Sequence, residues 1–456
     1  MAQRVNMDWI LFWTILGMVC LGLVMVYSAS SVVQELKANA PVDAVLDPDG
    51  PDPIPRQTGF LSPRRIGAAA IGIAVLAAIC MGLYRSLIPV SWGIPGALAA
   101  VLLQVLAYWM EVDRTPHYAF LVRQAGAALV GFFAMMVLSQ RDYRHLCSPQ
   151  WAFAGLASVL FLLIVVYFAD EDKHRWLNVG ISIQPAEFAK PALIVFLAWF
   201  VTQRAGTINR PRTVWSAGLA LTALAGAVVV PDFGTAIVLV ATAAALFYLA
   251  GLNWRYTAAA AIIGMVLLGG AILFKPYRLK RCIDYFDPKY KILVYVDPGK
   301  RLLNYAESGT SIKDTRYHAL QAKIAVGAGG ATGRGLMQSR QKLLFLPEAH
   351  NDYIFAIIAE ELGLPGSLFV LLVFAIILWR GYRLYWTAPD EFGKYLAAGV
   401  TTAIVFQALL NMSVVLDLGP TKGIPLPLVS FGGSSLLSTM ICLGLLLSVS
   451  QRSSAA

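Results

Sequence analysis

The sequence predicts an all-α polytopic membrane protein. Hydrophobic residues make up 58% of the chain and charged residues 14%, whereas soluble domains carry about 25% charged residues. The mean hydropathy is +0.66. Apolar runs that reach the roughly 20 residues a membrane-crossing helix needs recur along the chain. The net charge of +10 does not indicate nucleic-acid binding, because the sequence contains no basic recognition helix and no nucleic-acid-binding module.

The apolar runs predict twelve membrane spans, an even number that places both termini on one side of the bilayer. They fall at about 8–28, 66–84, 88–110, 120–139, 151–169, 185–203, 213–230, 233–250, 256–274, 353–379, 395–417 and 427–449.

Charge in the short loops sets the expected orientation. Cytoplasmic loops are enriched in Lys and Arg. One set of short loops is strongly basic and carries Arg85, Arg141, Arg144, Arg204, Arg210, Arg212, Arg255, Arg380, Arg383 and Lys394. Both termini are therefore expected in the cytoplasm, and the long loop 275–352 outside. Long loops do not follow the charge rule, so the basic character of this loop is no objection.

Residues 275–352 form the longest polar segment after the first span. They hold fourteen Lys/Arg and seven Asp/Glu, a surplus of seven positive charges (14 − 7). Glycines punctuate the second half of the loop and allow a close backbone approach to phosphate groups. A basic, glycine-rich loop between membrane spans predicts contact with an anionic, lipid-linked substrate, although a flexible outer loop would have the same composition.

Acidic and basic residues inside apolar spans are functional candidates by default, because they cost free energy near lipid. Glu187 and Lys190 follow Pro185 and share one face of a helix start. They are expected to line a cavity, with a capped helix start and a snorkelling lysine as the simpler alternative. Glu360 and Glu361 are adjacent acids in an apolar run, which packing alone does not explain.

Two further segments are less specific when taken singly. Asp232 lies in the run Pro231–Thr235, which indicates a tight turn. Three prolines between 420 and 427 exclude a continuous helix, and the small residues around Ser434 allow close helix contact. The five cysteines show no metal-ligand spacing and no disulfide framework.

Together, these stretches resemble the SEDS family, the RodA/FtsW/SpoVE proteins of bacterial cell-wall synthesis. The matching stretches occur in the family's order, at Val24–Ser30, Arg175–Asn178, Gln184–Lys190, Pro231–Thr235, Leu346–Phe355, Glu360–Gly363 and Pro425–Ser435. The run from Tyr317 to Gly330 is more similar to RodA than to FtsW. The resemblance implies the family's bundle of ten helices, so residues 31–117 are interpreted as an insertion that adds two.

The family's essential loop aspartate has two candidates in this chain. In the family it stands in an Asp-Pro pair a few residues before a Gly-Tyr. Here Asp314 lies three residues before Tyr317 but is followed by Thr, whereas Asp297 keeps the proline and lies twenty residues before Tyr317. Asp314 is favoured as the catalytic base, and Asp297 is the runner-up.

The resemblance implies a peptidoglycan glycosyltransferase in the bacterial inner membrane that polymerises lipid II, for cell elongation or division, beside a class B penicillin-binding protein. It specifies no cofactor and leaves a divalent cation, Mg²⁺ or Mn²⁺, open. A lipid II flippase and a scaffold for the transpeptidase are the alternatives. The residues expected to contact substrate or shape its cavity are Arg175, Glu187, Lys190, Asp232, Lys323, Arg340, Glu348, His350, Asp352, Glu361 and Ser434.

Overall fold

A computed structural model describes residues 7–39, 119–169, 175–179, 181–229, 231–273, 276–287, 297, 304, 314–343, 346, 349–420 and 423–453. Residues 34–122 form a separate compact unit, of which only the ends of two helices are described. The predicted spans 66–84 and 88–110, and with them most of the proposed insertion, lie outside the described residues.

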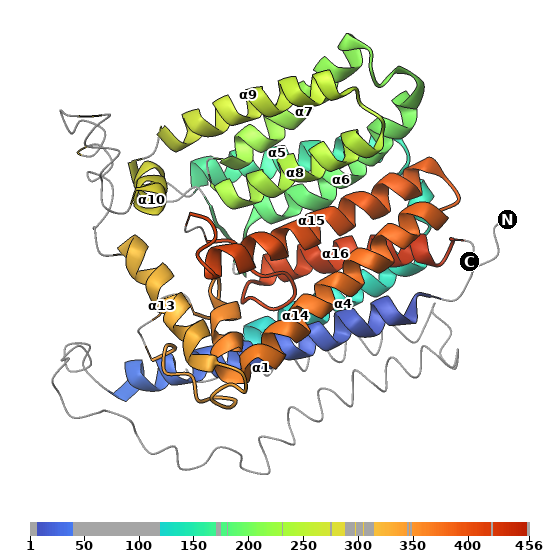
Figure 1. The fold of residues 1–456 in the computed structure, drawn as a ribbon. Coiled ribbons are helices and arrows are strands. Elements are labelled where there is room, and N and C mark those ends of the chain that lie inside the picture. Colours follow the sequence, from blue (N-terminus) through green and yellow to red (C-terminus); the bar gives the residue numbers. More distant parts are fainter. Residues whose placement is uncertain are drawn as a thin grey trace, which may run out of the picture. The chain divides into compact units, whose positions relative to one another are not determined.

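Ten of the twelve predicted spans are helices, which confirms an all-α polytopic membrane protein (Figure 1). They are α1 (Trp9–Asn39), α4 (Ala119–Gln140), α5 (Pro149–Ala169), α6 (Pro185–Arg204), α7 (Pro211–Val229), α8 (Phe233–Leu249), α9 (Trp254–Leu273), α14 (Ile354–Thr387), α15 (Glu391–Val415) and α16 (Gly433–Ser450). Among the described residues, eight helices are long and apolar enough to cross a membrane, and α8 is a shorter apolar helix.

The remaining elements are short. Two 3₁₀ turns, η3 (Tyr143–Leu146) and η4 (Ala205–Thr207), connect spans, and β1 (Leu177–Val179) pairs antiparallel with β2 (Ile181–Ile183). The large polar loop contains two helices that the sequence did not predict, α10 (Pro276–Phe286) and α13 (Asp314–Gly329). The last of these lies against α14 (Figure 1).

Helices α6, α15 and α16 form the interior of the bundle. Between 72% and 83% of the most apolar window of each is buried, against 22% to 28% in α4, α5 and α7. Helix α15 packs on α6, α8, α14 and α16, and α6 also packs on α5 and α8. The outer helices present apolar side chains such as Phe161 and Trp215, as expected of surfaces that face lipid.

The two termini lie at the same end of the bundle. Asp8 forms an ion pair with Arg380 at 2.7 Å, and its backbone N–H donates to Ser450 Oγ at 3.4 Å. Arg452 forms an ion pair with Asp142 at 3.4 Å. Arg380 and Asp142, which the sequence assigned to one side, therefore lie at the end of the bundle where both termini lie.

Helix starts follow from local capping. Pro185 begins α6 at a position where its missing N–H costs nothing. The Asp232 carboxylate caps α8 by accepting from the N–H groups of Gly234 and Thr235, at 2.9 and 3.2 Å. The predicted turn at Asp232 is thus a helix cap. Helix α16 begins at Gly433, six residues later than predicted, after a turn in which Leu428 has a φ of 68°.

Helix α14 is broken where the sequence predicted a continuous span. Gly363 has φ 65° and ψ −152°, and Pro365 has no N–H to offer the carbonyl of Glu361. Loop 330–335 fills the gap. The N–H groups of Arg334 and Gly335 donate to the carbonyls of Glu360 and Glu361, at 3.0 and 2.9 Å. The N–H of Leu364 donates to the carbonyl of Gly330 at 3.1 Å.

Gly333 tests this junction. It has a φ of 78°, and a Cβ there would collide with the backbone of Glu361 and Gly363. We expect Gly333→Ala to destabilise the protein by at least about 1–2 kcal/mol, from the left-handed backbone alone, seen as a lower Tm in detergent. Gly327→Ala is the matched control, because nothing surrounds that position within 4 Å. Equal Tm values for the two variants would contradict the packing of Gly333 against the break in α14.

Candidate functional site

Glu187 and Lys190 form a buried ion pair on the first turns of α6. Lys190 Nζ lies 2.6 Å from a Glu187 carboxylate oxygen, and the two side chains are 5% and 1% exposed. Lys190 Nζ also donates to Gln407 Oε1 of α15 at 2.7 Å. A buried charge pair is costly unless it is compensated, and here the second helix supplies part of the compensation.

Asp232 joins the α8 cap to the segment before α6. Its second carboxylate oxygen accepts from Thr235 Oγ1 at 2.9 Å and from Gln184 Nε2 at 3.1 Å. The Arg175 guanidinium lies 3.7 Å from the same oxygen and 5.8 Å from the centre of the Trp176 ring. The Arg175 side chain, although it contacts Asp232 and Trp176, is 37% exposed.

Ser434 connects these two groups to α16. Its Oγ accepts from the backbone N–H of Gln184 at 3.0 Å, and Ser438 Oγ donates to the carbonyl of Glu187 at 2.7 Å. The structure therefore brings five predicted site residues into one polar assembly, which we call the α6 assembly: Arg175, Glu187, Lys190, Asp232 and Ser434. Gln184 and Gln407, which hold it together, were not singled out from the sequence.

The segment before α14 is fixed by its backbone. The carbonyl of His350 accepts from Phe431 N–H at 2.9 Å, and the carbonyl of Asp352 accepts from Asn411 Nδ2 at 2.7 Å. The His350 ring lies edge-on to Phe431 with the ring centres 5.7 Å apart. The segment is thereby tied to α15 and to the turn before α16. Glu348 lies outside the described residues.

Helix α13 carries the predicted base at its first residue. The Asp314 side chain lies outside the described part of the structure, so its role as the base stays a prediction. The His318 ring stacks on Tyr353 with the ring centres 6.0 Å apart. Burial raises the pKa of Tyr353 to about 12. Asp297 is the only residue between 288 and 303 that the structure describes.

Lys323 is engaged by a carboxylate. Its Nζ lies 2.5 Å from Asp417, two residues beyond the end of α15, and its side chain is 52% exposed. This pair is separate from the α6 assembly in its contacts. The prediction that Lys323 touches substrate is not tested by this geometry.

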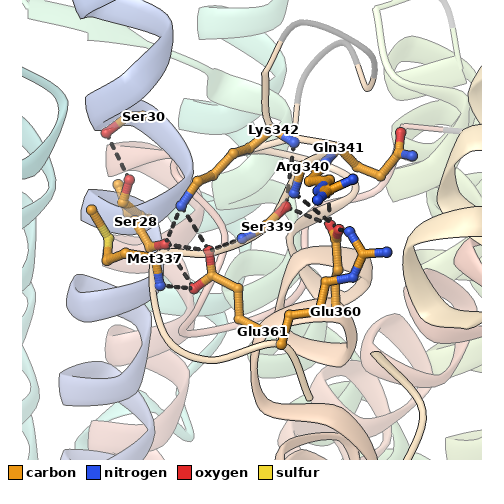
Figure 2. Close-up of polar contacts among 11 residues, drawn as sticks. Ser28, Ser30, Met337, Ser339, Arg340, Gln341, Lys342, Glu360 and Glu361 are labelled. Carbon is orange, nitrogen blue, oxygen red and sulfur yellow. Dashed lines mark hydrogen bonds and ion pairs between the residues drawn. The ribbon is translucent and has the colours of Figure 1, made fainter. Parts of the chain in front are cut away.

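Glu361 lies at the centre of a second buried cluster, between α1, loop 337–342 and α14 (Figure 2). Its carboxylate accepts from Ser28 Oγ at 2.6 Å, from Met337 N–H at 2.9 Å and from Lys342 Nζ at 2.9 Å. Both charged side chains are at most 1% exposed. Burial lowers the pKa of the Lys342 ammonium, and the Glu361 carboxylate opposes that shift.

Glu360 organises the adjoining part of the same loop. Its carboxylate accepts from Ser339 Oγ at 2.5 Å and from Arg340 N–H at 3.0 Å, and it pairs with Arg334 at 3.3 Å. We call this set the α14 cluster: Ser28, Arg334, Ser339, Arg340, Lys342, Glu360 and Glu361. The sequence indicated the two glutamates and Arg340 but missed Lys342. Two acids in an apolar helix need a nearby cation. The basic residues just before α14 in the chain could therefore have indicated Lys342 as a partner.

Within the described residues, no three His, Cys, Asp or Glu side chains are grouped so that they could hold a metal ion. The acids of both assemblies are instead satisfied by cations, hydroxyls and backbone N–H groups.

The chain resembles known proteins over most of its length. A family model named FTSW_RODA_SPOVE and described as "Cell cycle protein" matches residues 85–455. Stage V sporulation protein E of Bacillus subtilis is 36% identical over 355 residues, which cover 76% of this chain and 91% of that protein. A probable peptidoglycan glycosyltransferase FtsW of Geobacter metallireducens is 35% identical over 343 residues, covering 74% and 86%.

Solved structures share the fold. One chain, from work described as "Structural coordination of polymerization and crosslinking by a peptidoglycan synthase complex", matches with a TM-score of 0.56 and 24% identity. That match covers 79% of this chain and 97% of the other. The rod shape determining protein RodA of Thermus thermophilus matches with a TM-score of 0.52 and 22% identity, covering 80% and 98%.

The Glu187–Lys190 pair makes a stability prediction. Lys190→Met leaves a buried carboxylate without its cation, which costs about 3–5 kcal/mol, so the Tm in detergent should fall by several degrees. Adding Glu187→Leu should restore much of the loss. Lys394→Met is the matched control: Lys394 pairs with Glu391 at the same i,i+3 spacing and 2.7 Å, but at 33% and 51% exposure. Its loss should be about 0–1 kcal/mol, and equal losses at the two sites would refute the burial argument.

Proposed function

The chain belongs to the FtsW/RodA/SpoVE family, and from that premise we propose that it is a peptidoglycan glycosyltransferase. It would join the disaccharide units of lipid II and release undecaprenyl pyrophosphate. Two supports come from outside the site: relatives at about one-third identity are named probable peptidoglycan glycosyltransferase FtsW, and the chain is a multi-pass membrane protein. The observation that carries the proposal is the α6 assembly, a charged site built into the helix starts of an apolar bundle.

The reaction moves one proton and breaks one bond. A hydroxyl of the acceptor sugar attacks the anomeric carbon of the donor and forms the new glycosidic bond. The bond from that carbon to the diphosphate breaks, and its electrons leave with the diphosphate. We assign the hydroxyl proton to the Asp314 carboxylate at the start of α13, since a carboxylate within hydrogen-bond reach can act as the general base.

Charge on the departing diphosphate has to be stabilised as it develops. Arg175 is suited to this role, because Asp232 and Trp176 orient it while its guanidinium stays partly exposed. Lys190 is not suited to direct contact, because Glu187 and Gln407 already occupy its ammonium group. We therefore assign the Glu187–Lys190 pair to shaping the cavity wall and Arg175 to the leaving group.

The expected orientation follows from the charge of the loops. We propose that the termini, which meet Arg380 and Asp142 at one end of the bundle, lie in the cytoplasm of a bacterium and that loop 275–352 lies outside its inner membrane. A class B penicillin-binding protein is the proposed partner, since a structural relative comes from work on a peptidoglycan synthase complex. Relatives named FtsW and SpoVE and structures of RodA do not separate division from elongation, so elongation stays a prediction from Tyr317–Gly330.

A lipid II flippase is the second candidate. The break in α14 at Gly363 and the buried Glu187–Lys190 pair are features that transporters share. Both functions need the same lipid-linked headgroup. They differ in whether a glycosidic bond forms.

The decisive experiment uses purified full-length protein and labelled lipid II, with and without the transpeptidase partner. We expect wild-type protein to make glycan strands. Asp314→Asn should abolish them, because an amide cannot accept the hydroxyl proton, and should leave expression and Tm unchanged. Asp297→Asn, the same chemical change in the same loop, is the matched control and should remain active.

Other outcomes would reassign the role. Strands from Asp314→Asn but none from Asp297→Asn would move the base to residue 297. If wild-type protein made no polymer but moved the lipid II headgroup across liposomes, the flippase would replace the glycosyltransferase.

A further inference from the structure

The α6–α7 and α8–α9 loops are hydrogen-bonded to each other through one asparagine side chain. Asn209, which lies between α6 and α7, donates from Nδ2 to the carbonyl of Gly251 at 3.1 Å. Its Oδ1 accepts from the Asn253 N–H at 2.6 Å. The Asn253 Oδ1 accepts in turn from Arg255 N–H, on the first turn of α9, at 3.1 Å. Asn209 therefore fixes the start of α9 beside the segment that leads into α7.

Both loops lie at the end of the bundle where the termini lie. Helices α6, α8 and α16 begin together around Gln184, which contacts Asp232 at the start of α8 and Ser434 at the start of α16. Helix α6 packs along both of the other two. The far end of α16 meets the N-terminal segment, because Asp8 N–H donates to Ser450 Oγ at 3.4 Å. The two loops, which follow the far ends of α6 and α8, are therefore at that same end.

Four arginines surround the two joined loops, and we call them the loop arginines: Arg204, Arg210, Arg212 and Arg255. The first ends α6, the next two flank the proline that begins α7, and the last lies on the first turn of α9. All four are exposed. Within the part of the chain that the structure describes, none of the four forms an ion pair.

The neighbouring sequence supplies no acid to the loop arginines. Between Glu187 and Asp284 the only acidic residue is Asp232, which caps the opposite end of α8. The first turns of α7 and α9 contain no acidic residue, although acids stabilise a helix at that position. The positive charge of the loop arginines is therefore not neutralised by the segments that carry them.

Other cations at this end of the bundle do have carboxylate partners. Four pairs lie within 3.4 Å: Arg144–Asp390, Arg380–Asp8, Lys394–Glu391 and Arg452–Asp142. The enrichment of cytoplasmic loops in Lys and Arg explains why cations gather at one end, but not why one group of them is unpaired. Because like charges repel, the loop arginines favour an anion that comes from outside the chain.

Exposed aromatic side chains flank the loop arginines. Trp215, Tyr248 and Trp254 are each at least 74% exposed. Trp215 lies one turn after Arg212 on α7, and Trp254 is adjacent to Arg255. Trp and Tyr are enriched where the hydrocarbon of a bilayer meets its headgroups. The loop arginines are therefore expected at the depth of the lipid headgroups.

We propose that the loop arginines bind the headgroup phosphate of an anionic phospholipid such as phosphatidylglycerol. Clusters of about four to eight Lys or Arg at a membrane surface attract anionic lipids, and guanidinium groups match phosphate oxygens with paired N–H donors. The acyl chains would lie along apolar side chains such as Leu219 of α7 and Ile262 of α9, which are 73% and 59% exposed. Bilayer lipid is not the proposed substrate, so this site is independent of the proposed function.

The contact made by Asn209 adds to the expected affinity. It holds arginines from two loops close together before any lipid arrives. Binding then costs less conformational entropy than it would for two independent loops. The lipid is accordingly expected to bind at a defined site instead of through diffuse attraction to the surface.

The experiment measures lipid binding by full-length protein in detergent. Native mass spectrometry gives the Kd of the first bound phosphatidylglycerol, and phosphatidylcholine with the same acyl chains is the comparison without net charge. Arg212→Gln/Arg255→Gln removes one arginine from each loop. It should raise the Kd for phosphatidylglycerol about 25-fold, about fivefold for each arginine at a membrane surface. Arg212→Lys/Arg255→Lys keeps the charge and should lose less affinity.

The matched control removes the same charge at the same end of the bundle. Arg144→Gln/Lys394→Gln changes two cations that already have the carboxylate partners Asp390 and Glu391, and it should bind phosphatidylglycerol as wild type does. Because Arg212 and Arg255 are exposed, the variants at these positions should keep the wild-type Tm, which shows that their loops are still folded.

Three results would overturn the proposal: a Gln variant at 212 and 255 that binds phosphatidylglycerol as tightly as wild type, an equal loss of affinity in the Arg144/Lys394 control, or equal wild-type affinities for phosphatidylglycerol and phosphatidylcholine. The assay scores neither glycan strands nor headgroup transfer. Failure of the glycosyltransferase would therefore leave the lipid site standing, and failure of the lipid site would leave the glycosyltransferase standing.

Discussion

The break in α14 is the constraint on which loop 330–342 and its contacts depend. A backbone carbonyl left unpaired in a membrane costs several kcal/mol, and the break frees those of Glu360 and Glu361. Loop 330–335 supplies the missing N–H groups, which Gly333 permits by bringing its backbone against Gly363. Once the loop is held there, the two glutamate side chains fall within reach of residues 337–342.

The segment that follows this loop and leads into α14 is hydrogen-bonded to other parts of the bundle. The carbonyls of His350 and Asp352 are bound by Phe431 N–H and by Asn411 of α15, and α15 also supplies Gln407 to Lys190. The α14 cluster and the α6 assembly are thus joined through one buried helix. Helix α15 contacts the segment that leads into α14 through Asn411 and the α6 assembly through Gln407.

Sequence reasoning located the helices better than the contacts between them. Apolar length alone predicted ten of the helices, because the bilayer imposes that length. It gave no sign of the break in α14, since Gly363 and Pro365 are each tolerated in continuous spans. Helices α10 and α13 were missed because their polar composition resembles that of a loop. Glu361 could be singled out, but its partners Ser28 and Lys342 are brought to it only by the fold.

Burial separates the cations that hold the structure from those that can meet a substrate. Lys190 and Lys342 are each at most 5% exposed and each lies within 3 Å of a glutamate oxygen. Exchanging that partner for a phosphate would leave a carboxylate buried without its cation, at a cost of about 3–5 kcal/mol. Arg175 contacts Asp232 at 3.7 Å but its side chain is 37% exposed. The Arg340 N–H donates to Glu360, and its guanidinium forms no ion pair with any residue that the structure describes. Of these four cations, the two arginines are therefore accessible to an anionic group without the loss of a buried lysine–glutamate pair, whereas Lys190 and Lys342 are not.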